Sequence, residues 1–455
     1  MSGLRSLRPA DVGVDGPTSL DMLRGFRSIR TDPLTFLVAA QRRYGDLVAF
    51  PVPGAPVLLV NDPADVRQVL VTGARRWGKQ TVQYTSLARV TGPGLLASSD
   101  PSWLQHRRIA APAFHHRRLQ AVADQVRAAA REAASRWKAL PPEGAVVDVA
   151  ELSLRVALDV VGRALFSADL SERSQRLLDA TSDAAQLIVS LGRSVVPVPE
   201  WVPTRVNRRL HAASRELDAL CRQLIDRRRR RGTTSHGDDL LGLLIDGGLS
   251  DRGVRDEIVT MVVAGHETVA AAISWTLMLL AEDQAAQDRL RAEVCAHDGP
   301  MPMVATTEAV PWTRAVVDES LRLYPPAWVV SRRSSRADVL SGREVPAGTT
   351  AIVSPWLLHR REQSFTQPEE FRPERFLGGT PTTARSDYVP FGLGPRLCIG
   401  RDFAIGEMVV VLGELLSIHR VSTPRPWTRP DPQTLVAVHP RGGMPLHVRP
   451  VHPGR

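Results

Sequence analysis

The residue with the most distinctive chemistry is Cys398, in the stretch FGLGPRLCIG at residues 391–400. A deprotonated cysteine sulfur is a soft metal ligand that suits iron. The surrounding glycines let backbone pack closely against a flat ligand and leave N–H groups for the sulfur. Most lone cysteines are buried and structural, but this spacing of glycine, phenylalanine and arginine has no reason to accompany an inert thiol. The stretch therefore predicts an iron-binding thiolate.

Glu267 and Thr268 place a carboxylic acid directly before a hydroxyl, within the stretch AGHET at residues 264–268. The surrounding pattern predicts a long helix that begins at Ser250–Asp251. A threonine inside a helix can donate to the carbonyl four residues earlier and loosen the helix there. An adjacent acid and hydroxyl suit a proton relay, whereas in an ordinary helix the same pair would have no chemical role.

A third pattern is Glu319 and Arg322, three residues apart in the stretch ESLR. This spacing places the two side chains on one helix face. Alone the pattern means little, because exposed ion pairs of this kind are common and contribute little stability.

These segments together resemble the cytochrome P450 monooxygenases. Residues 391–400 match the family's heme-binding loop, F-G-x-G-x-R-x-C-x-G, at every fixed position, and FRPERF at 371–376 is similar to its P-E-R-F segment. The resemblance covers about residues 30 to 450. It implies a mainly α fold with a small β-rich part, in which heme lies between the long central helix and the cysteine-loop helix. We expect an N-terminal extension over 1–29 and one large domain over 30–455.

The resemblance also implies roles for individual residues. Cys398 would bind the iron of heme b, and Glu267 and Thr268 would deliver protons beside bound O2. Gly265 would remove a side chain where the helix approaches the ligand. Glu319, Arg322 and Arg375 would form a structural network before the cysteine loop. The other residues expected at the cofactor are Trp103, Arg107, Arg333, Arg396, Phe391, Gly392, Gly400, Ala264 and Ala404, with Arg332 as a rival to Arg333.

The substrate pocket implied by the family is apolar. It would be lined by the 74–99 and 185–203 regions and by residues that carry no charge, which indicates a hydrophobic substrate. The named lining residues are Val262, Val263, Trp328, Val329, Val330 and Leu435.

The expected reaction inserts one atom of O2 into a terpenoid, fatty acid, steroid or macrolide-like molecule. No flavin or NAD fingerprint is present, so electrons would come from a separate ferredoxin and ferredoxin reductase. The alternatives are a heme-thiolate peroxygenase or isomerase, and a heme-binding sensor or carrier without catalysis. The Glu267–Thr268 pair argues against both.

The composition of the chain indicates its size class, its redox compartment and whether it spans a membrane. The chain has 455 residues, of which 43% are hydrophobic, enough for a large core. Three widely spaced cysteines, Cys221, Cys295 and Cys398, argue for a reducing, cytoplasmic protein without disulfides. Residues 1–21 contain no apolar run of a signal peptide or membrane span. We therefore expect a soluble, monomeric enzyme of bacterial type, since membrane-anchored relatives carry such a span.

The net charge of +10 comes almost entirely from arginine, because Lys79 and Lys138 are the only lysines. The run Arg227–Arg231 is interpreted as a solvated helix end whose cations complement the helix dipole. No nucleic-acid motif accompanies it, so no nucleic-acid partner is expected. His115–Arg118 and Arg401 are candidates for a face that docks an acidic ferredoxin.

Helices and strands follow from periodicity and turn residues. A hairpin is predicted over Asp46–Val60 with its turn at Pro53–Pro56, and helices are predicted to open at Asp62–Pro63 and at Asp100–Pro101. Residues 74–99 are predicted to be a long loop. The chain is helical to about residue 325, with breaks at proline and glycine clusters. Short strands are expected over 326–355 and after 420, with a helix over 401–418.

Overall fold

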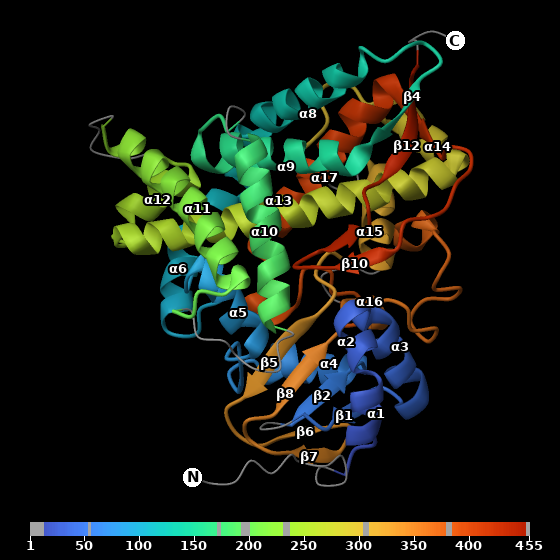
Figure 1. Ribbon diagram of the computed structural model, residues 1–455. Helices are drawn as coiled ribbons and strands as arrows, with labels where there is room; N and C mark the ends of the chain where they lie inside the picture. Colours follow the sequence, from blue (N-terminus) through green and yellow to red (C-terminus); the bar gives the residue numbers. More distant parts are fainter. Residues whose placement is uncertain are drawn as a thin grey trace. The chain divides into compact units, whose positions relative to one another are not determined.

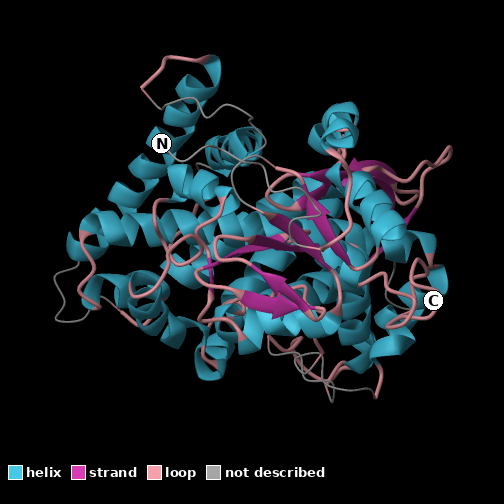
Figure 2. Cartoon of the chain, turned by 90° about the horizontal axis from the view of Figure 1, so that it is seen from below, coloured by secondary structure: helices cyan, strands magenta, loops and turns pink. Residues whose placement is uncertain are grey.

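The computed structural model describes residues 13–52, 56–170, 174–192, 201–230, 237–303, 309–378 and 385–451. Helices predominate over small sheets (Figure 2), as predicted. The chain divides into two compact units. The first comprises residues 1–85, 322–370 and 379–398, and the second comprises 86–321, 371–378 and 399–455. Parts of three predicted breaks or turns, at 53–55, 197–200 and 232–236, lie outside the described residues.

The first unit is built around a five-stranded sheet in the order β1-β2-β8-β5-β3. Strands β2 and β8 are parallel and the other neighbouring pairs are antiparallel. The strands are β1 (Leu47–Phe50), β2 (Val57–Val60), β3 (Trp77–Gly78), β5 (Val330–Ser334) and β8 (Thr350–Val353), with a separate hairpin of β6 (Asp338–Leu340) and β7 (Arg343–Val345). This confirms the predicted hairpin, in which Leu47 faces Val60.

Short helices accompany this sheet (Figure 1). Helix α4 begins where predicted, because the Asp62 carboxylate accepts from the backbone N–H groups of Ala64 and Asp65 and Pro63 takes the first position. The helices are α1 (Ser19–Arg24), α2 (Phe26–Thr31), α3 (Pro33–Tyr44), α4 (Pro63–Arg67), η2 (Gln68–Thr72), α16 (Pro355–Leu358) and η7 (Gly394–Arg396).

The second unit is organised around α13 (Asp251–Glu282), with α9, α11, α12 and α17 packed against it. Its remaining helices and its strands surround this centre. The other helices are α6 (Ser102–Ala110), η3 (Ala111–Phe114), α7 (His116–Ala121), α8 (Ala123–Trp137), α9 (Val149–Phe166), α10 (Ser174–Gly192), α11 (Arg205–Arg230), α12 (Leu240–Asp246), α14 (Gln284–Ala296), α15 (Pro311–Leu323), η5 (Pro373–Phe376) and α17 (Arg401–Ile418). The strands are β4 (Ala145–Asp148), β9 (His419–Ser422), β10 (Pro432–Thr434), β11 (Val438–Pro440) and β12 (Pro445–Pro450).

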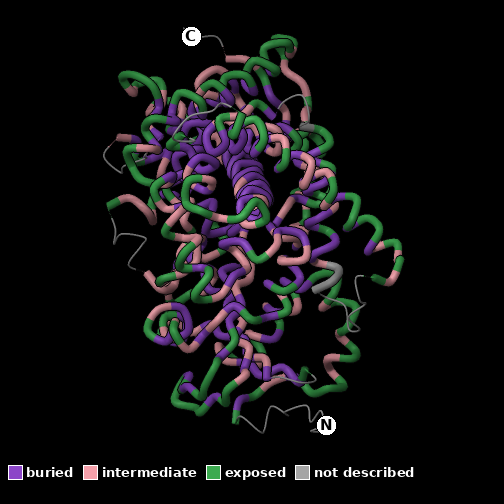
Figure 3. The backbone as a smooth tube through the Cα atoms, turned by 90° about the vertical axis from the view of Figure 1, so that its left-hand side faces the viewer, coloured by how far each residue is buried: buried purple, intermediate pink, exposed green. Residues whose placement is uncertain are grey.

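Helix α13 is apolar around most of its circumference, which is the pattern of a helix buried on all sides. Most of its residues are buried, and buried residues are purple in Figure 3. It is long and apolar enough to cross a membrane, but 83% of its most apolar window is buried inside the protein. Its start was predicted correctly, since the Ser250 hydroxyl accepts from Gly253 N–H.

Two predicted features are wrong. The 74–99 region is not a long loop, because α5 (Val82–Thr91) runs through it and ends before Gly92, whose φ of 71° suits glycine. The sequence of α5 hides the helix, since its valines and threonines have low helix propensity. The capping at Asp100–Pro101 also differs from the prediction, because α6 does follow but Pro101, rather than Asp100, occupies the position before its first residue.

The arginine run is also not simply a solvated helix end. Arg227, Arg229 and Arg230 are exposed, but Arg228 turns inward and its guanidinium donates two hydrogen bonds of 2.6 Å to the Asp239 carboxylate. Both side chains are buried, at 8% and 3% exposure. Burial would raise the pKa of Asp239, but the hydrogen bonds from Arg228, Ser167 and Gly242 N–H outweigh it and hold the pKa below its usual value.

We expect Asp239→Ala to lower the free energy of unfolding by about 3–5 kcal/mol, because it leaves a buried guanidinium without its carboxylate. The matched control is Arg229→Ala, which removes a neighbouring ion pair to Asp251 whose side chains are 45% and 66% exposed. That change should cost at most about 1 kcal/mol. Denaturant unfolding measures both, and equal effects would contradict a special role for the buried pair.

Candidate active site

In the first unit, Cys398 lies at the end of a glycine-shaped loop. Gly392 and Gly394 have φ angles of 73° and 72°, which other residues rarely adopt. A Cβ on Gly394 would lie 2.1 Å from the carbonyl oxygen of Leu70 in η2, so this close approach also requires glycine. The backbone N–H of Cys398 donates to Phe391 O at 3.0 Å, and its thiol is exposed and in no disulfide.

In the second unit, one short stretch of α13 is less buried than the residues around it. Val262, Val263, His266 and Glu267 are buried, whereas Ala264, Gly265 and Thr268 are only half-buried. These three residues share one helix face. The Thr268 hydroxyl donates to Ala264 O at 2.7 Å, as the sequence predicts, while the helix stays continuous through this point.

Helix α6 of the same unit carries two of the predicted cofactor residues. Trp103 is buried, and the half-buried Arg107 guanidinium lies 5.6 Å from the centre of its ring. Between them, His106 Nδ1 lies 2.6 Å from the Glu257 carboxylate of α13. The pair therefore connects α6 to α13 about two turns before Ala264, where the half-buried face begins.

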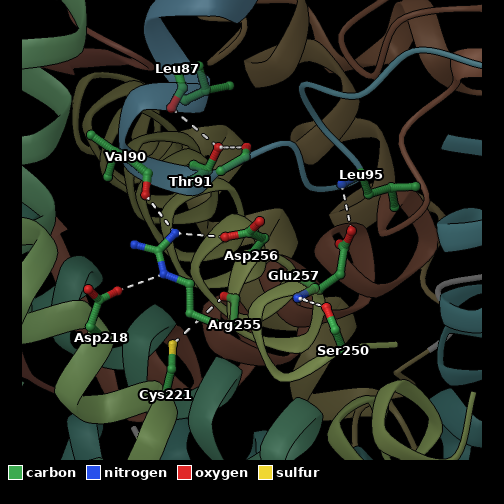
Figure 4. Close-up of polar contacts among 12 residues, drawn as sticks. Leu87, Val90, Thr91, Leu95, Asp218, Cys221, Ser250, Arg255, Asp256 and Glu257 are labelled. Carbon is green, nitrogen blue, oxygen red and sulfur yellow. Dashed lines mark hydrogen bonds and ion pairs between the residues drawn. The ribbon is translucent and has the colours of Figure 1, made fainter. Parts of the chain in front are cut away.

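Glu257 is fully buried and holds a second element as well. Its Oε1 accepts from the backbone N–H of Leu95 at 2.8 Å (Figure 4). The neighbouring Arg255 donates to the Asp218 carboxylate of α11, to Asp256 and to Val90 O at the end of α5 (Figure 4). Arg255 and Glu257, two residues apart on α13, thus hold the segment between Val90 and Leu95.

A cavity of about 500 Å³ lies beside this cluster, between α5, α11 and α13. Charged side chains dominate its lining, in contrast to the apolar pocket expected from the sequence. Cys221 also lines it, and burial raises the pKa of this thiol to about 12, so it stays protonated and unreactive. The charged residues that line the cavity are Arg89, Arg222, Arg252, Arg255, Asp218, Asp226, Asp251 and Asp256.

Of the predicted structural residues, Glu319 and Arg322 are fully buried in their own units and Arg375 is half-buried. In the second, the fully buried Glu319 carboxylate accepts from Arg375 Nε at 3.2 Å and from the backbone N–H of Arg372 at 2.9 Å. In the first, the fully buried Arg322 donates to the carbonyl oxygens of His359, Pro368 and Glu370. Each charged group thus has hydrogen-bond partners in the segment before the cysteine loop.

The remaining predicted residues are spread over several environments. In β5, Arg333 is exposed, while its rival Arg332 is buried and donates to the Tyr84 hydroxyl at 3.0 Å. Phe391, Arg396, Gly400 and Ala404 are half-buried, as are four of the expected pocket residues: Trp328, Val329, Val330 and Leu435.

Comparisons with known proteins identify the family. A model of the family described as Cytochrome P450 matches residues 20–446. The chain belongs to the cytochrome P450 family. The cyclooctat-9-en-7-ol 5-monooxygenase of Streptomyces melanosporofaciens is 33% identical over 430 residues, which cover 91% of this chain and 90% of that one. The pentalenene oxygenase of Streptomyces avermitilis is 31% identical over 422 residues and covers 90% and 91%.

The fold agrees with this family. The crystal structure of CYP175A1 from Thermus thermophilus superposes with a TM-score of 0.76 at 30% identity, covering 96% of this chain and all of that one. A six-coordinated cytochrome P450 of the same species gives a TM-score of 0.72, also at 30% identity, covering 92% and 99%. The protein is a cytochrome P450 monooxygenase, an enzyme that uses heme iron, O2 and a redox partner to oxidise a small molecule.

Sequence reasoning missed three residues that position parts of this P450: the buried Glu257 and His359, and the half-buried His106. In the first unit, burial lowers the pKa of His359 to about 3, so its ring is neutral. Its Nε2 accepts from Val389 N–H at 2.8 Å, which leaves Nδ1 to donate to Arg322 O at 3.2 Å. No local motif marks such residues, because their partners lie 30 or more positions away.

The His106–Glu257 pair makes stability depend on pH. The hydrogen bond to Glu257 raises the pKa of His106 above 6.5, more than burial lowers it. The stabilising contribution is therefore fully present below about pH 6.5, the unfolded value, and is lost as pH rises through the folded value. We expect His106→Gln to destabilise the protein most below about pH 6.5, with a difference from the wild type that shrinks as pH rises through the raised pKa of His106.

Urea unfolding at several pH values measures this difference. His116→Gln, a change at an exposed histidine of α7, is the matched control and should show no such trend. A difference between wild type and His106→Gln that stayed constant or grew with pH would contradict the assignment.

Proposed function

We propose that this P450 inserts one atom of O2 into a hydrophobic small molecule and holds heme b through the Cys398 thiolate. The observation that carries the proposal is the Cys398 loop, in which glycines with positive φ present an exposed thiol. An exposed cysteine sulfur in a close-packed glycine loop is the donor that a heme-thiolate site needs. The half-buried face of Ala264, Gly265 and Thr268 supports it independently, because a helix buried elsewhere leaves room there for a ligand.

The other cofactor contacts proposed for this chain follow the family pattern. Arg107 and Trp103 of α6, with Arg396 and Arg333, would pair with the heme propionates, since arginine forks fit carboxylates bidentately. Small or flat side chains would lie against the ring. Those proposed are Phe391, Gly392, Gly400, Ala404, Ala264 and Gly265. Glu319, Arg322 and Arg375 would stabilise the segment that precedes the cysteine loop without contacting the reacting atoms.

Heme, when bound, supplies the O2 chemistry, and thiolate ligation favours cleavage of the O–O bond. The protein's part is to place substrate and protons. The Thr268 hydroxyl can accept a hydrogen bond from a proton donor. It donates its own hydrogen to Ala264 O, and its oxygen lone pairs remain available. Glu267, the next residue, would bring protons to it.

A terpenoid is the substrate class that we favour. Two relatives carry names for the oxidation of cyclooctat-9-en-7-ol and pentalenene, which are terpenoids. The proposed lining residues carry no charge, which suits such a substrate. They are Val262, Val263, Trp328, Val329, Val330 and Leu435.

We further propose a cytoplasmic monomer, with an N-terminal extension over residues 1–29 and the P450 domain over 30–455, that receives electrons from a ferredoxin and its reductase. Its surplus of arginine supports an acidic electron donor. Phe114 packs edge-on against Phe403, so the start of α7 and the start of α17 lie side by side in the second unit. His115–Arg118 and Arg401 therefore belong to one region of the surface.

Replacing the proposed ligand tests the core of this function. Reduced wild-type protein with CO should show the red-shifted Soret band of thiolate ligation, and Cys398→Ser should abolish it. Cys295→Ser, at the exposed cysteine of α14, is the control and should leave the spectrum unchanged. An intact thiolate spectrum in Cys398→Ser would rule out Cys398 as the ligand.

The docking proposal predicts salt-dependent reduction. First-electron transfer from an acidic ferredoxin should slow steeply as salt rises, because salt screens charges over about 10 Å at 0.1 M. Reversing charge with Arg117→Glu and Arg118→Glu should slow it further without changing substrate affinity. The matched control reverses two exposed arginines of α11, with Arg227→Glu and Arg230→Glu. Stopped-flow reduction rates that are flat with salt, or equal in both double variants, would exclude this face.

A further inference from the structure

Among the described residues, the Glu267 carboxylate is one of three buried glutamate carboxylates with an unpartnered oxygen, the others being Glu257 and Glu407, and it is the one that adjoins Thr268. The residue is buried, and its Oε2 has no hydrogen-bond partner among the described residues. A buried carboxylate oxygen without a hydrogen bond is costly, so each such group calls for an explanation beyond stability.

The adjacent histidine does not supply the missing partner. His266 Nδ1 lies 2.6 Å from Val262 O in its own helix, and its Nε2 lies 3.4 Å from the Thr181 hydroxyl of α10. Burial lowers the pKa of His266, so its ring is neutral near pH 7. It therefore neither compensates the charge of Glu267 nor exchanges protons readily.

A different histidine approaches Glu267 from a strand. His439 Nε2 of β11 lies 3.9 Å from Glu267 Oε2, and the His439 side chain is 17% exposed against 4% for Glu267. One imidazole thus reaches both solvent and the buried carboxylate. The gap is slightly longer than a hydrogen bond, and a small side-chain rotation or one bridging water closes it.

The strand that carries His439 is fixed to the same helix as Glu267. Trp275 Nε1 of α13 donates to Val438 O at 2.8 Å, and Gln433 of β10 pairs with His439 across the hairpin. Both contacts lie within the second unit. The separation of the imidazole and the carboxylate is therefore set by a buried hydrogen bond two turns along α13.

We propose that His439 takes protons from solvent and passes them to Glu267, which supplies Thr268. In the step, the Nε2–H bond of the imidazolium breaks and an O–H bond forms on Glu267 Oε2. The neutral imidazole then regains a proton from water, so nothing is oxidised or reduced. This inference rests on the proposed function, in which Glu267 and Thr268 deliver protons. Imidazole suits the task because it gains and loses a proton near neutral pH.

The rival explanation is an ion pair that only stabilises the fold. Two substitutions separate these explanations. His439→Gln removes both the charge and the transferable proton. His439→Arg keeps a positive charge beside Glu267, but arginine does not release protons in proteins. A structural ion pair would be restored by arginine, whereas proton transfer would not.

The experiment uses the heme-loaded enzyme with a surrogate ferredoxin system and a substrate found by heme absorbance. It measures the share of electrons lost as peroxide, the solvent deuterium isotope effect on product formation, and the melting temperature. We expect His439→Gln and His439→Arg to lose several-fold more electrons as peroxide and to show a larger isotope effect. His447→Gln, a half-buried histidine of β12, should behave as the wild type. Normal coupling in His439→Arg alone would overturn the proposal in favour of the structural ion pair.

A second readout does not depend on turnover. After a jump to lower pH, time-resolved infrared spectroscopy follows protonation of the Glu267 carboxyl, assigned through the band that Glu267→Gln removes. Both His439 variants should protonate this carboxyl several-fold more slowly than the wild type, and an unchanged rate would refute the transfer.

Glu267→Gln separates failure of this inference from failure of the proposed relay. If Glu267→Gln leaves coupling intact, the Glu267 relay is wrong and the inference falls with it. If Glu267→Gln uncouples the enzyme but both His439 variants remain coupled, only the inference is wrong. If His439 acts through Glu267, combining His439→Gln with Glu267→Gln should add little to Glu267→Gln alone.

Discussion

The burial of α13 is the constraint on which the second unit depends. A helix of 32 residues that is apolar on most sides must be covered on most sides. Helices α9, α11, α12 and α17 provide that cover. Such a helix can bury a polar side chain without a free-energy penalty where that side chain has a hydrogen-bond partner. In α13, Arg255 and Glu257 contact neighbouring elements, and His266 contacts the backbone of its own helix. The half-buried face at Ala264, Gly265 and Thr268 interrupts this cover within the helix.

The buried charged residues differ in their hydrogen-bond partners, and we assign them different roles. Arg228, Arg322 and Glu319 are buried with hydrogen-bond partners and hold segments together. Glu267 is buried without one at Oε2. Glu257 and Glu407 also have a buried oxygen without a partner among the described residues. The proposed role of Glu267 therefore depends on its position next to Thr268 and 3.9 Å from His439, in addition to the missing hydrogen bond.

The parts of this P450 that the sequence predicts are those whose signals are local. The Cys398 loop needs glycine at positive φ, and the start of α13 needs a capping serine. The β1–β2 hairpin follows from two short apolar runs on either side of a turn of prolines and glycine. Each can be recognised within about ten residues. The same holds for Glu319 and Arg375, because both lie in short segments, ESLR and FRPERF, that can be recognised locally.

The parts that the sequence does not predict depend on distant partners. Arg228 looks like a member of a solvated run until Asp239 is placed against it, and His106 has no signal without Glu257, 151 positions away. Helix α5 is a different case, since its valines and threonines favour strand locally and tertiary packing overrides them. The roles of the individual site residues stay predictions for another reason, because they concern contacts with heme, substrate and redox partner, which are not part of the chain.

The two anchors of the segment after α5 have a consequence for how this chain can vary. Val90 O is held by Arg255 and Leu95 N–H by Glu257, two residues apart on α13. The spacing on the helix is rigid, so an added or deleted residue between the anchors has to be absorbed within this short segment. Between them, Gly92 and Gly94 lie so close to Asp256 and Thr260 that neither position has room for a Cβ without movement of its neighbours. Insertions and deletions should therefore disturb the chain less before Val90 or after Leu95, and these positions are the natural boundaries for loop grafting from relatives.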